Sequence, residues 1–212
     1  PEPPDLRSRY YYVYHFIKRP DRTTARLSAA CQKNELQLQV QQYRHEDLRS
    51  KLERQAKALL AFRETYPQTA CRVHGIDAAS QEIECRPEVF APIFRMLHAH
   101  QPAKTYPMAP QLPQLRKTYH AGEDFLDVVD GLRAIDESIH FLELGYGDRI
   151  GHAIALGIDV AEWYENKKQQ IVLSKQDYLD NLAWMNHALT QYHLECADTL
   201  REFLRSEFDR YF

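Results

Sequence analysis

The spacing of hydrophobic residues changes along the chain between two periods and predicts both strands and helices. Residues 11–17 are aromatic and β-branched, and they predict a buried strand that ends before Pro20. Shorter runs of the same kind predict three more strands. These lie at residues 72–77, 115–119 and 149–154.

Two segments before residue 100 predict helices. Residues 43–65 are amphipathic, and Pro67 ends the segment. Pro87 suits the first turn of a second helix, because a proline there loses no hydrogen bond. The apolar face of the first helix contains Leu48, Leu52, Ala56, Leu59 and Arg63, and that of the second contains Phe90, Ile93, Phe94 and Leu97.

The clearest helical pattern begins near residue 127. Apolar side chains recur there at i, i+4, i+7, i+11 and i+14, which is one face of an α-helix. The charged residues fall on the other faces, away from the predicted core. The apolar positions are Val128, Leu132, Ile135, Ile139 and Leu142, and the charged ones are Asp127, Asp130, Arg133 and Glu137.

Strands and helices alternate up to about residue 170, without the Asn-Gly pair that marks a tight hairpin. This order predicts an α/β fold of parallel βα units, preceded by an extended leader at residues 1–10. Residues 171–212 are helical in pattern, with a capping box at Ser174–Asp177 and an apolar stripe that reaches Phe203. One straight helix to Phe212 would be about 55 Å long. A kinked helix and a helical hairpin are the alternatives.

Composition narrows the class of protein. The chain has 212 residues, of which 44% are hydrophobic and 27% charged, and its net charge of −3 gives no bulk attraction to nucleic acid or membrane. No apolar run is long enough to span a bilayer, and no signal peptide is recognisable. The four cysteines form no CxxC pair. We therefore expect reduced thiols and a cytoplasmic protein.

The candidate chemistry lies in residues 120–123, His-Ala-Gly-Glu, where a predicted strand ends. In parallel βα folds, the carboxyl ends of the strands face the active site. His120 can bind a metal through one nitrogen, and Gly122 lets the backbone turn tightly. A shielded carboxyl group such as Glu123 can hold a proton near neutral pH. This spacing fits metal-assisted hydrolysis.

Two further motifs flank this one at intervals of about one βα unit. Residues 75–82 read Gly-Ile-Asp-Ala-Ala-Ser-Gln-Glu, and residues 148–153 read Asp-Arg-Ile-Gly-His-Ala. Over residues 72–156 the three motifs together resemble the adenosine deaminase family. That family has the patterns Gly/x-x-Asp-x-Ala-Gly-x-Glu, His-Ala-Gly-Glu and Arg-Ile/Val-Gly-His-Gly.

The resemblance implies a (β/α)8 barrel with one zinc ion, with residues 11–170 as part of the barrel and residues 171–212 as a helical insertion or extension. It implies that His120 is a zinc ligand, that Glu123 protonates the purine nitrogen N1, and that His152 orients and deprotonates the attacking water. Ser80 stands where the family has a glycine whose backbone meets the purine. Ala153 replaces another family glycine.

The rest of the family's zinc site is not convincingly present in the sequence. The family takes two ligands from a His-x-His and one from a late Asp. His98 and His100 form a His-x-His, but they end a predicted helix, where two rings do not converge on one point. A cationic imidazole near a helix C-terminus has a simpler cause in the helix dipole. We therefore expect this chain to be a fragment, the middle of a larger deaminase-like protein.

Within the family, the third motif and the helical tail are most similar to the deaminase subunits of the bacterial RADAR phage-defence system. This similarity implies deamination of adenosine, ATP or adenosine in RNA to the inosine form. It also implies a large homo-oligomer assembled through the tail, an ATPase partner in antiviral defence, and no membrane.

Other interpretations stay open. His120 and His152 can be structural histidines at strand ends, with Glu123 as a helix cap, and Ser80 can be a plain turn or N-cap residue. The whole chain can be a catalytically incomplete scaffold of deaminase ancestry, or another metal-dependent hydrolase on the same barrel. Metal content and substrate profiling separate these possibilities.

Overall fold

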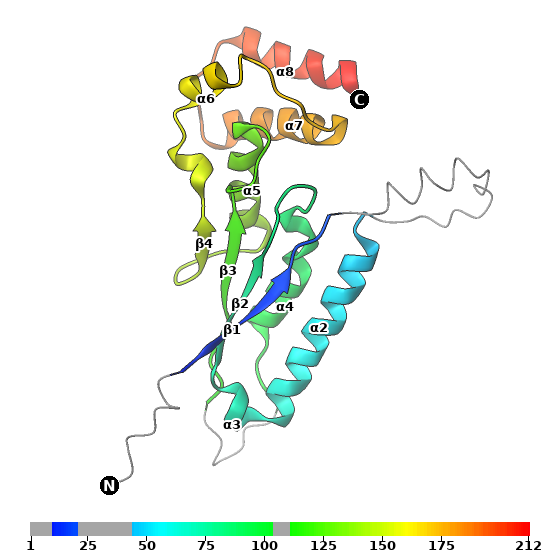
Figure 1. Ribbon diagram of the computed structural model, residues 1–212, viewed down its shortest axis with the longest axis vertical. Coiled ribbons are helices and arrows are strands. Elements are labelled where there is room, and N and C mark those ends of the chain that lie inside the picture. Colours follow the sequence, from blue (N-terminus) through cyan, green and yellow to red (C-terminus); the bar gives the residue numbers. More distant parts are fainter. Residues whose placement is uncertain (1–9, 21–43, 104–110) are drawn as a thin grey trace, which may run out of the picture. The chain divides into compact units, whose positions relative to one another are not determined.

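The computed structural model describes residues 10–20, 44–103 and 111–212, so the predicted leader lies outside it except for Tyr10. A four-stranded sheet in the order β1-β2-β3-β4 confirms the α/β class (Figure 1). The strands are β1 (Tyr12–Ile17), β2 (Val73–Ala79), β3 (Arg116–Ala121) and β4 (Arg149–His152). The helices are α2 (Glu46–Thr65), α3 (Pro67–Ala70), α4 (Ala91–Ala99), α5 (Val128–Phe141), α6 (Val160–Asn166), α7 (Lys175–Gln191) and α8 (Asp198–Tyr211), with 3₁₀ turns η3 (Pro87–Val89) and η4 (Ile154–Gly157).

The strands lie in the sheet in their sequence order. β1 and β2 pair in parallel, with His15 opposite Asp77, and β2 and β3 pair in parallel, with Asp77 opposite Thr118. Parallel neighbours need a crossover connection, and each connection here contains a helix. The predicted βα units are therefore confirmed.

The chain divides into two compact units. The first comprises the described residues up to His120 together with Glu137–Gly151, and the second comprises Ala121–Asp136 and His152–Phe212. Helix α5 contributes residues to both units.

The core of the first unit is apolar and follows the predicted pattern. All five residues predicted for the inner face of α2 are buried, and so are the four predicted around α4. Helices α2 and α4 contact each other and lie along the sheet (Figure 1). Phe90 and Phe94 pack edge-on against the ring of Tyr119 in β3. The sheet therefore buries one face against these helices.

The prediction of a buried first strand was wrong in part. Among the residues of β1 only Phe16 is buried, while Val13 is 39% and Ile17 is 44% exposed. Side chains alternate across a strand, so Phe16 points to the helices and its neighbours point to the opposite face. No described strand pairs with the outer edge of β1.

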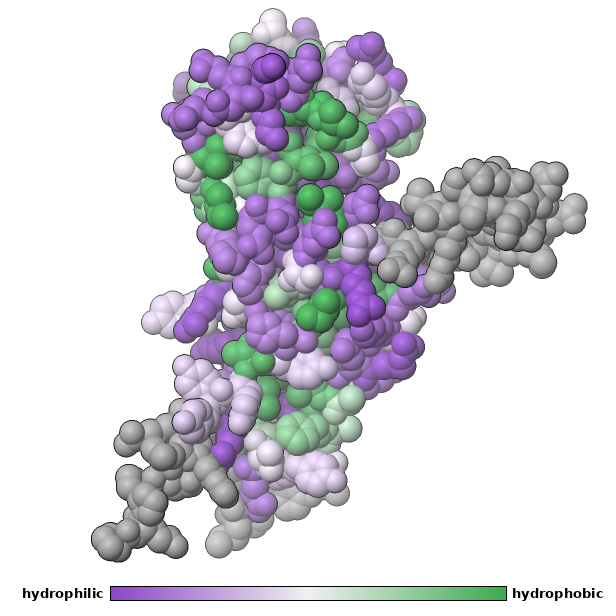
Figure 2. All heavy atoms as spheres, viewed as in Figure 1, coloured by the Kyte–Doolittle hydropathy of each residue, from purple (hydrophilic) through white to green (hydrophobic). Residues whose placement is uncertain are grey.

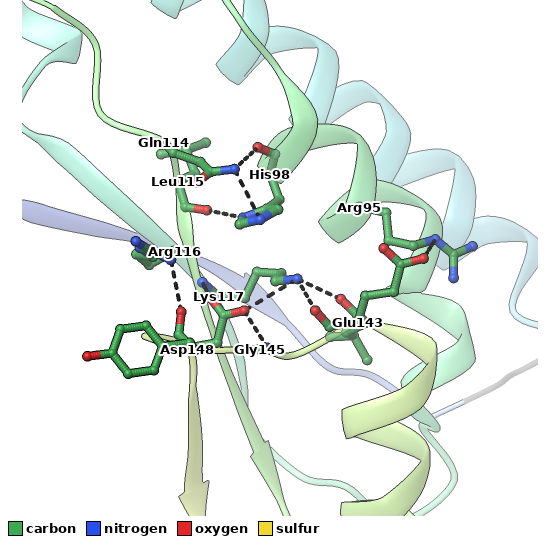
Figure 3. A network of polar contacts seen from close by, with 11 residues as sticks. Arg95, His98, Gln114, Leu115, Arg116, Lys117, Glu143, Gly145 and Asp148 are labelled. Carbon is green, nitrogen blue, oxygen red and sulfur yellow. Dashed lines mark hydrogen bonds and ion pairs between the residues drawn. The ribbon is translucent and has the colours of Figure 1, made fainter.

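A buried lysine ties the start of β3 to the turn that precedes β4 (Figure 3). The Lys117 ammonium donates hydrogen bonds to the carbonyl oxygens of Leu142, at 2.9 Å, and Glu143, and it lies 3.4 Å from Asp148 Oδ2. Asp148 in turn accepts from the backbone N–H groups of Lys117 and Gly145, at 2.8 and 3.0 Å. These contacts fix the turn from which the third sequence motif starts.

The second unit ends in a helical hairpin, so the chain adopts one of the alternatives to a single long helix. Ser174 caps α7 by accepting a hydrogen bond from the N–H of Asp177, as the capping box predicts. Helix α7 ends at Gln191, and His193 has a left-handed backbone with φ of 50°. Helix α8 then packs on α7, with Leu204 buried.

The charged residues around the start of α5 are buried, although they were predicted to lie away from the core. Asp127, Asp130 and Arg133 are 4%, 7% and 1% exposed, whereas Ile139 on the predicted apolar stripe is 40% exposed. The Arg133 guanidinium lies 3.3–3.6 Å from carboxylate oxygens of Asp130 and, in α7, Asp177 and Asp180. Ion pairs across to α7 thus compensate for burying this face.

The surface is mixed in polarity. Hydrophilic side chains occur all over the face shown in Figure 2, with apolar side chains gathered in small groups between them. Within the part of the chain that the structure describes, no helix combines the length and the apolar character needed to cross a bilayer.

Candidate functional site

Three side chains from neighbouring strands of the first unit meet on the sheet face opposite the helices. The period-2 alternation places His15 of β1, Asp77 of β2 and His120 of β3 on this face. Nδ1 of His120 lies 3.1 Å from Oδ1 of Asp77, and Nδ1 of His15 lies 3.2 Å from Oδ2 of the same carboxylate. We call these three residues the Asp77 cluster.

The Asp77 carboxylate determines which ring nitrogen of His120 carries the hydrogen. An ionised carboxylate only accepts hydrogen bonds, so Nδ1 is the donor and Nε2 is the unprotonated nitrogen of the neutral ring. The Asp77 side chain is 4% exposed and that of His120 is 23% exposed. A histidine whose second nitrogen is held by a buried carboxylate is the usual arrangement of a metal ligand.

The backbone and ring of His120 are also held in place. Lys18, which is 2% exposed, donates a hydrogen bond to the backbone oxygen of His120, and its ammonium lies 4.4 Å from the centre of the Tyr119 ring. A Cβ at Gly151 would stand 2.5 Å from Cδ2 of His120. The glycine of the third motif therefore makes room for the histidine of the second.

The second unit contains the other two predicted catalytic residues, and they touch each other. Nε2 of His152 lies 2.9 Å from Oε2 of Glu123, with side chains that are 51% and 22% exposed. Gly122 precedes Glu123 with φ of 75°, and a Cβ there would stand 2.5 Å from Cδ1 of Ile135. Only glycine fits this turn, as the hinge in the motif predicts.

The two positions that depart from the family glycines keep a glycine-like backbone. Ser80, directly after β2, has φ of 89°, and Ala153, directly after β4, has φ of 50°. Residues with a side chain rarely adopt such values. The exposed Ser80 thus has a backbone conformation that favours glycine, while its predicted substrate contact stays a prediction.

The two histidines of the His-x-His at residues 98–100 make structural contacts, as expected. His98 Nδ1 donates to the backbone oxygen of Leu115 at 2.8 Å, and Nε2 of His100 lies 2.9 Å from Oε1 of Glu64. Nδ1 of His100 also accepts from Arg63 at 3.3 Å. Both rings therefore fasten the end of α4 to its neighbours.

The residues present fit a zinc ion at one ligand position. His120 has the right donor and the right carboxylate partner, yet the described residues contain no group of three His, Cys, Asp or Glu side chains placed to hold a metal. A structural zinc needs four ligands and a catalytic zinc three. We therefore derive no reaction step through the metal.

The sequence analysis assigned no role to His15 or Asp77, although the role of Asp77 could have been predicted. Asp77 lies inside the first motif, and the period-2 pattern of two neighbouring strands would have aligned it with His120. The register that brings His15 opposite Asp77 becomes visible only in the paired sheet. The catalytic roles of Glu123 and His152 and the ligand role of His120 stay predictions.

The predicted site residues thus make one carboxylate–imidazole contact in each unit. The buried Asp77 holds the ring of His120, whereas the partly exposed Glu123 and His152 can pass a proton between them or to a bound molecule. No known family model matches this chain, and no curated protein matches it.

Proposed function

We propose that this protein takes part in the zinc-dependent hydrolytic deamination of an adenine-containing substrate. The observation that carries the proposal is the hydrogen bond from His120 Nδ1 to the buried Asp77 at the carboxyl end of a parallel strand. The resemblance of the three motifs to the adenosine deaminase family supplies the reaction type. The left-handed backbone at Ser80 and Ala153 supports that resemblance.

We propose further that the sheet is part of a (β/α)8 barrel. Parallel strands in strict sequence order support this, because a doubly wound sheet reverses its order at a switch point. The exposure of Val13, His15 and Ile17 on the face opposite the helices also supports it. Parallel sheets are covered on both faces, and in a barrel the second face is the interior.

The residues of this chain would act as follows. His120 would hold the zinc ion through one ring nitrogen, and a bound zinc ion would supply a Lewis acid that lowers the pKa of water. As the resemblance implies, His152 would orient the attacking water and accept its proton. Glu123 would donate a proton to N1 of the purine as the water oxygen adds to C6. Loss of ammonia from C6 then leaves the inosine form.

The remaining expectations belong to the same proposal. The substrate is adenosine, ATP or adenosine in RNA, and the protein works in the cytoplasm. The α7–α8 hairpin, with Leu200 and Phe203 exposed at 41% and 53%, would carry contacts between copies of the protein. An ATPase would be the partner in antiviral defence.

One observation favours a second function, a scaffold without catalysis. The described residues offer one implied zinc ligand and not a complete set. A different metal-dependent hydrolase on the same barrel is the third candidate, and only its substrate separates it from a deaminase.

The deciding experiment follows ammonia release from adenosine, ATP and an adenosine-containing RNA by the zinc-loaded protein. We expect release from one of these substrates and its loss, by a factor of at least about 100, in Glu123→Gln. The variant should keep its zinc, because Glu123 is not a proposed ligand. Glu165→Gln, at an exposed glutamate of α6, is the matched control and should keep full activity.

Three results would contradict the proposal or a part of it. Substantial activity in Glu123→Gln would remove Glu123 from the mechanism. No release from any substrate despite bound zinc would favour another hydrolase, and no release with no zinc would favour the scaffold.

A further inference from the structure

The Asp77 carboxylate has two imidazole partners, and the proposed function uses only one of them. His15 Nδ1 lies 3.2 Å from Oδ2, while His120 Nδ1 lies 3.1 Å from Oδ1. We propose that His15 is a positioning residue, which fixes the plane of the Asp77 carboxylate and thereby the ring of His120. The proposal rests on the proposed function only for the identity of the metal.

The carboxylate of an aspartate side chain can rotate with little restriction. Rotation about its last torsion is broad, so a single hydrogen bond at Oδ1 leaves the carboxylate plane poorly determined. A second donor at Oδ2, from the other side, restricts that rotation. The strand register brings Nδ1 of His15 to 3.2 Å from Oδ2, because His15 stands directly opposite Asp77 in the paired strands, and we infer that this nitrogen is the second donor.

The burial of Asp77 makes a second partner for its carboxylate more important. The Asp77 side chain is only 4% exposed, so water is a poor substitute donor for Oδ2, and a buried carboxylate oxygen without a donor is costly. His15 itself is 51% exposed, so its ring contributes little to the apolar core. Its contact with Asp77 is therefore the interaction that its removal would change most.

The consequence concerns the nitrogen that His120 presents. With Asp77 held from both sides, the Nδ1–H form of His120 is favoured and Nε2 keeps its lone pair for a ligand. Without the second donor, Asp77 can turn, and the neutral ring populates both tautomers. Partners of this kind commonly change metal affinity by 10–100-fold.

The variants are chosen to separate the hydrogen bond from the shape of the side chain. His15→Leu removes the donor at similar volume, and His15→Asn keeps an N–H donor near the position of Nδ1. His15→Val is a second donor-free variant that suits a strand, in case the leucine variant does not fold. His74→Leu, at an exposed histidine of β2 that contacts Tyr11, is the matched control.

Two measurements are made on the purified chain. Ring-nitrogen NMR of the metal-free protein, at a pH where His120 is neutral, should show mainly the Nδ1–H form in the wild type, His15→Asn and His74→Leu. It should show a mixture of tautomers in His15→Leu. Zinc binding, measured by competition with a chelator, should weaken about tenfold or more in His15→Leu and less than about threefold in the other two variants.

The outcomes separate this inference from the proposed function. An unchanged His120 tautomer in folded His15→Leu or His15→Val would overturn the positioning role, whatever the activity. A wild type that binds no zinc but shows the tautomer change would support the positioning role and contradict the zinc-dependent function. If the wild type binds zinc, equal zinc affinity in His15→Leu and His15→Asn would also overturn the inference.

Discussion

The two units of this chain are stabilised in different ways. In the first unit the interior is mainly apolar and aromatic, with Phe16, Leu52 and Phe94 almost completely buried. Its buried cations donate hydrogen bonds to backbone carbonyl oxygens; they are Lys18, Arg63 and Lys117. In the second unit the interior around α5 contains a buried guanidinium, Arg133, which pairs with carboxylates of α5 and α7. Trp184 and Tyr192 add hydrogen bonds to Asp136. The difference teaches that a charged residue on a helix does not by itself mark the solvent side.

The largest effect is expected from removing the central cation of the second unit. Arg133→Met leaves the carboxylates of Asp130, Asp177 and Asp180 without their cation, and we expect a loss of about 3–5 kcal/mol in the free energy of unfolding. Urea unfolding followed by tryptophan fluorescence measures it, because both tryptophans lie in the second unit. Arg54→Met, at an exposed position of α2, should change stability by less than about 0.5 kcal/mol. Equal effects of the two variants would remove the contrast.

A cavity in the first unit should cost somewhat less. Leu52 is 1% exposed in α2, and Leu52→Ala should lower the free energy of unfolding by about 3 kcal/mol through lost burial and an unfilled cavity. Amide hydrogen exchange of β2, together with far-UV circular dichroism in urea, would report the loss. Leu200→Ala, at a 41% exposed leucine of α8, is the control, and a cost as large as that of Leu52→Ala would contradict the assignment of the core.

The hydrogen bond between Tyr164 and Asp127 should make the stability of the second unit depend on pH. The Tyr164 hydroxyl donates to Asp127 Oδ1 at 2.6 Å. Burial, and then this bond, raise the pKa of Tyr164 above its usual value of about 10, while burial raises the pKa of Asp127 against the opposing effect of the bond. We expect Tyr164→Phe to cost about 1.5–3 kcal/mol near pH 7.

The sign of the pH dependence follows from the raised pKa. The Tyr164 hydroxyl keeps its proton more firmly in the folded state, so the stabilisation is complete below about pH 10 and is lost as the pH rises through the folded-state pKa. Chemical unfolding of the wild type and Tyr164→Phe from pH 7 to 11 tests this. Stability curves that stay parallel over that range would contradict the prediction.

The smallest effect, and a gain, is expected at Ser80 and Ala153, which have positive φ and lie one in each unit. Ser80→Gly and Ala153→Gly relieve a backbone strain of about 1–2 kcal/mol, offset by about 0.4–1 kcal/mol of added freedom in the unfolded chain. Each should therefore raise stability by about 0.5–1 kcal/mol. Ala58→Gly, at an exposed site inside α2, should instead lower it by about 1 kcal/mol. Calorimetry measures the change in stability of each variant. A change of the same sign in all three variants would contradict the predicted backbone strain.

Sequence reasoning succeeded where one local period decides the structure. The inner face of α2, the four strands and the capping box at Ser174 were all predicted, because apolar spacing and cap chemistry depend on nearby residues alone. It failed for the exposure of β1, and it left open whether the apolar stripe of the tail forms one helix or a hairpin. Whether a strand is covered, and whether a helix continues or turns back, depends on elements far away in the chain.

The candidate site shows the same division. Residue type and spacing in residues 120–123 predict a ligand, a hinge and a carboxylate. The positive φ of Gly122 and its lack of room for a Cβ agree with the hinge. The pairing of Asp77 with both His15 and His120 required the register of three strands. The burial of Arg133 among three carboxylates likewise required α7 to pack against α5. Electrostatic and hydrogen-bonding partners that are distant in sequence meet only when the chain has folded, so tertiary structure alone assigned them.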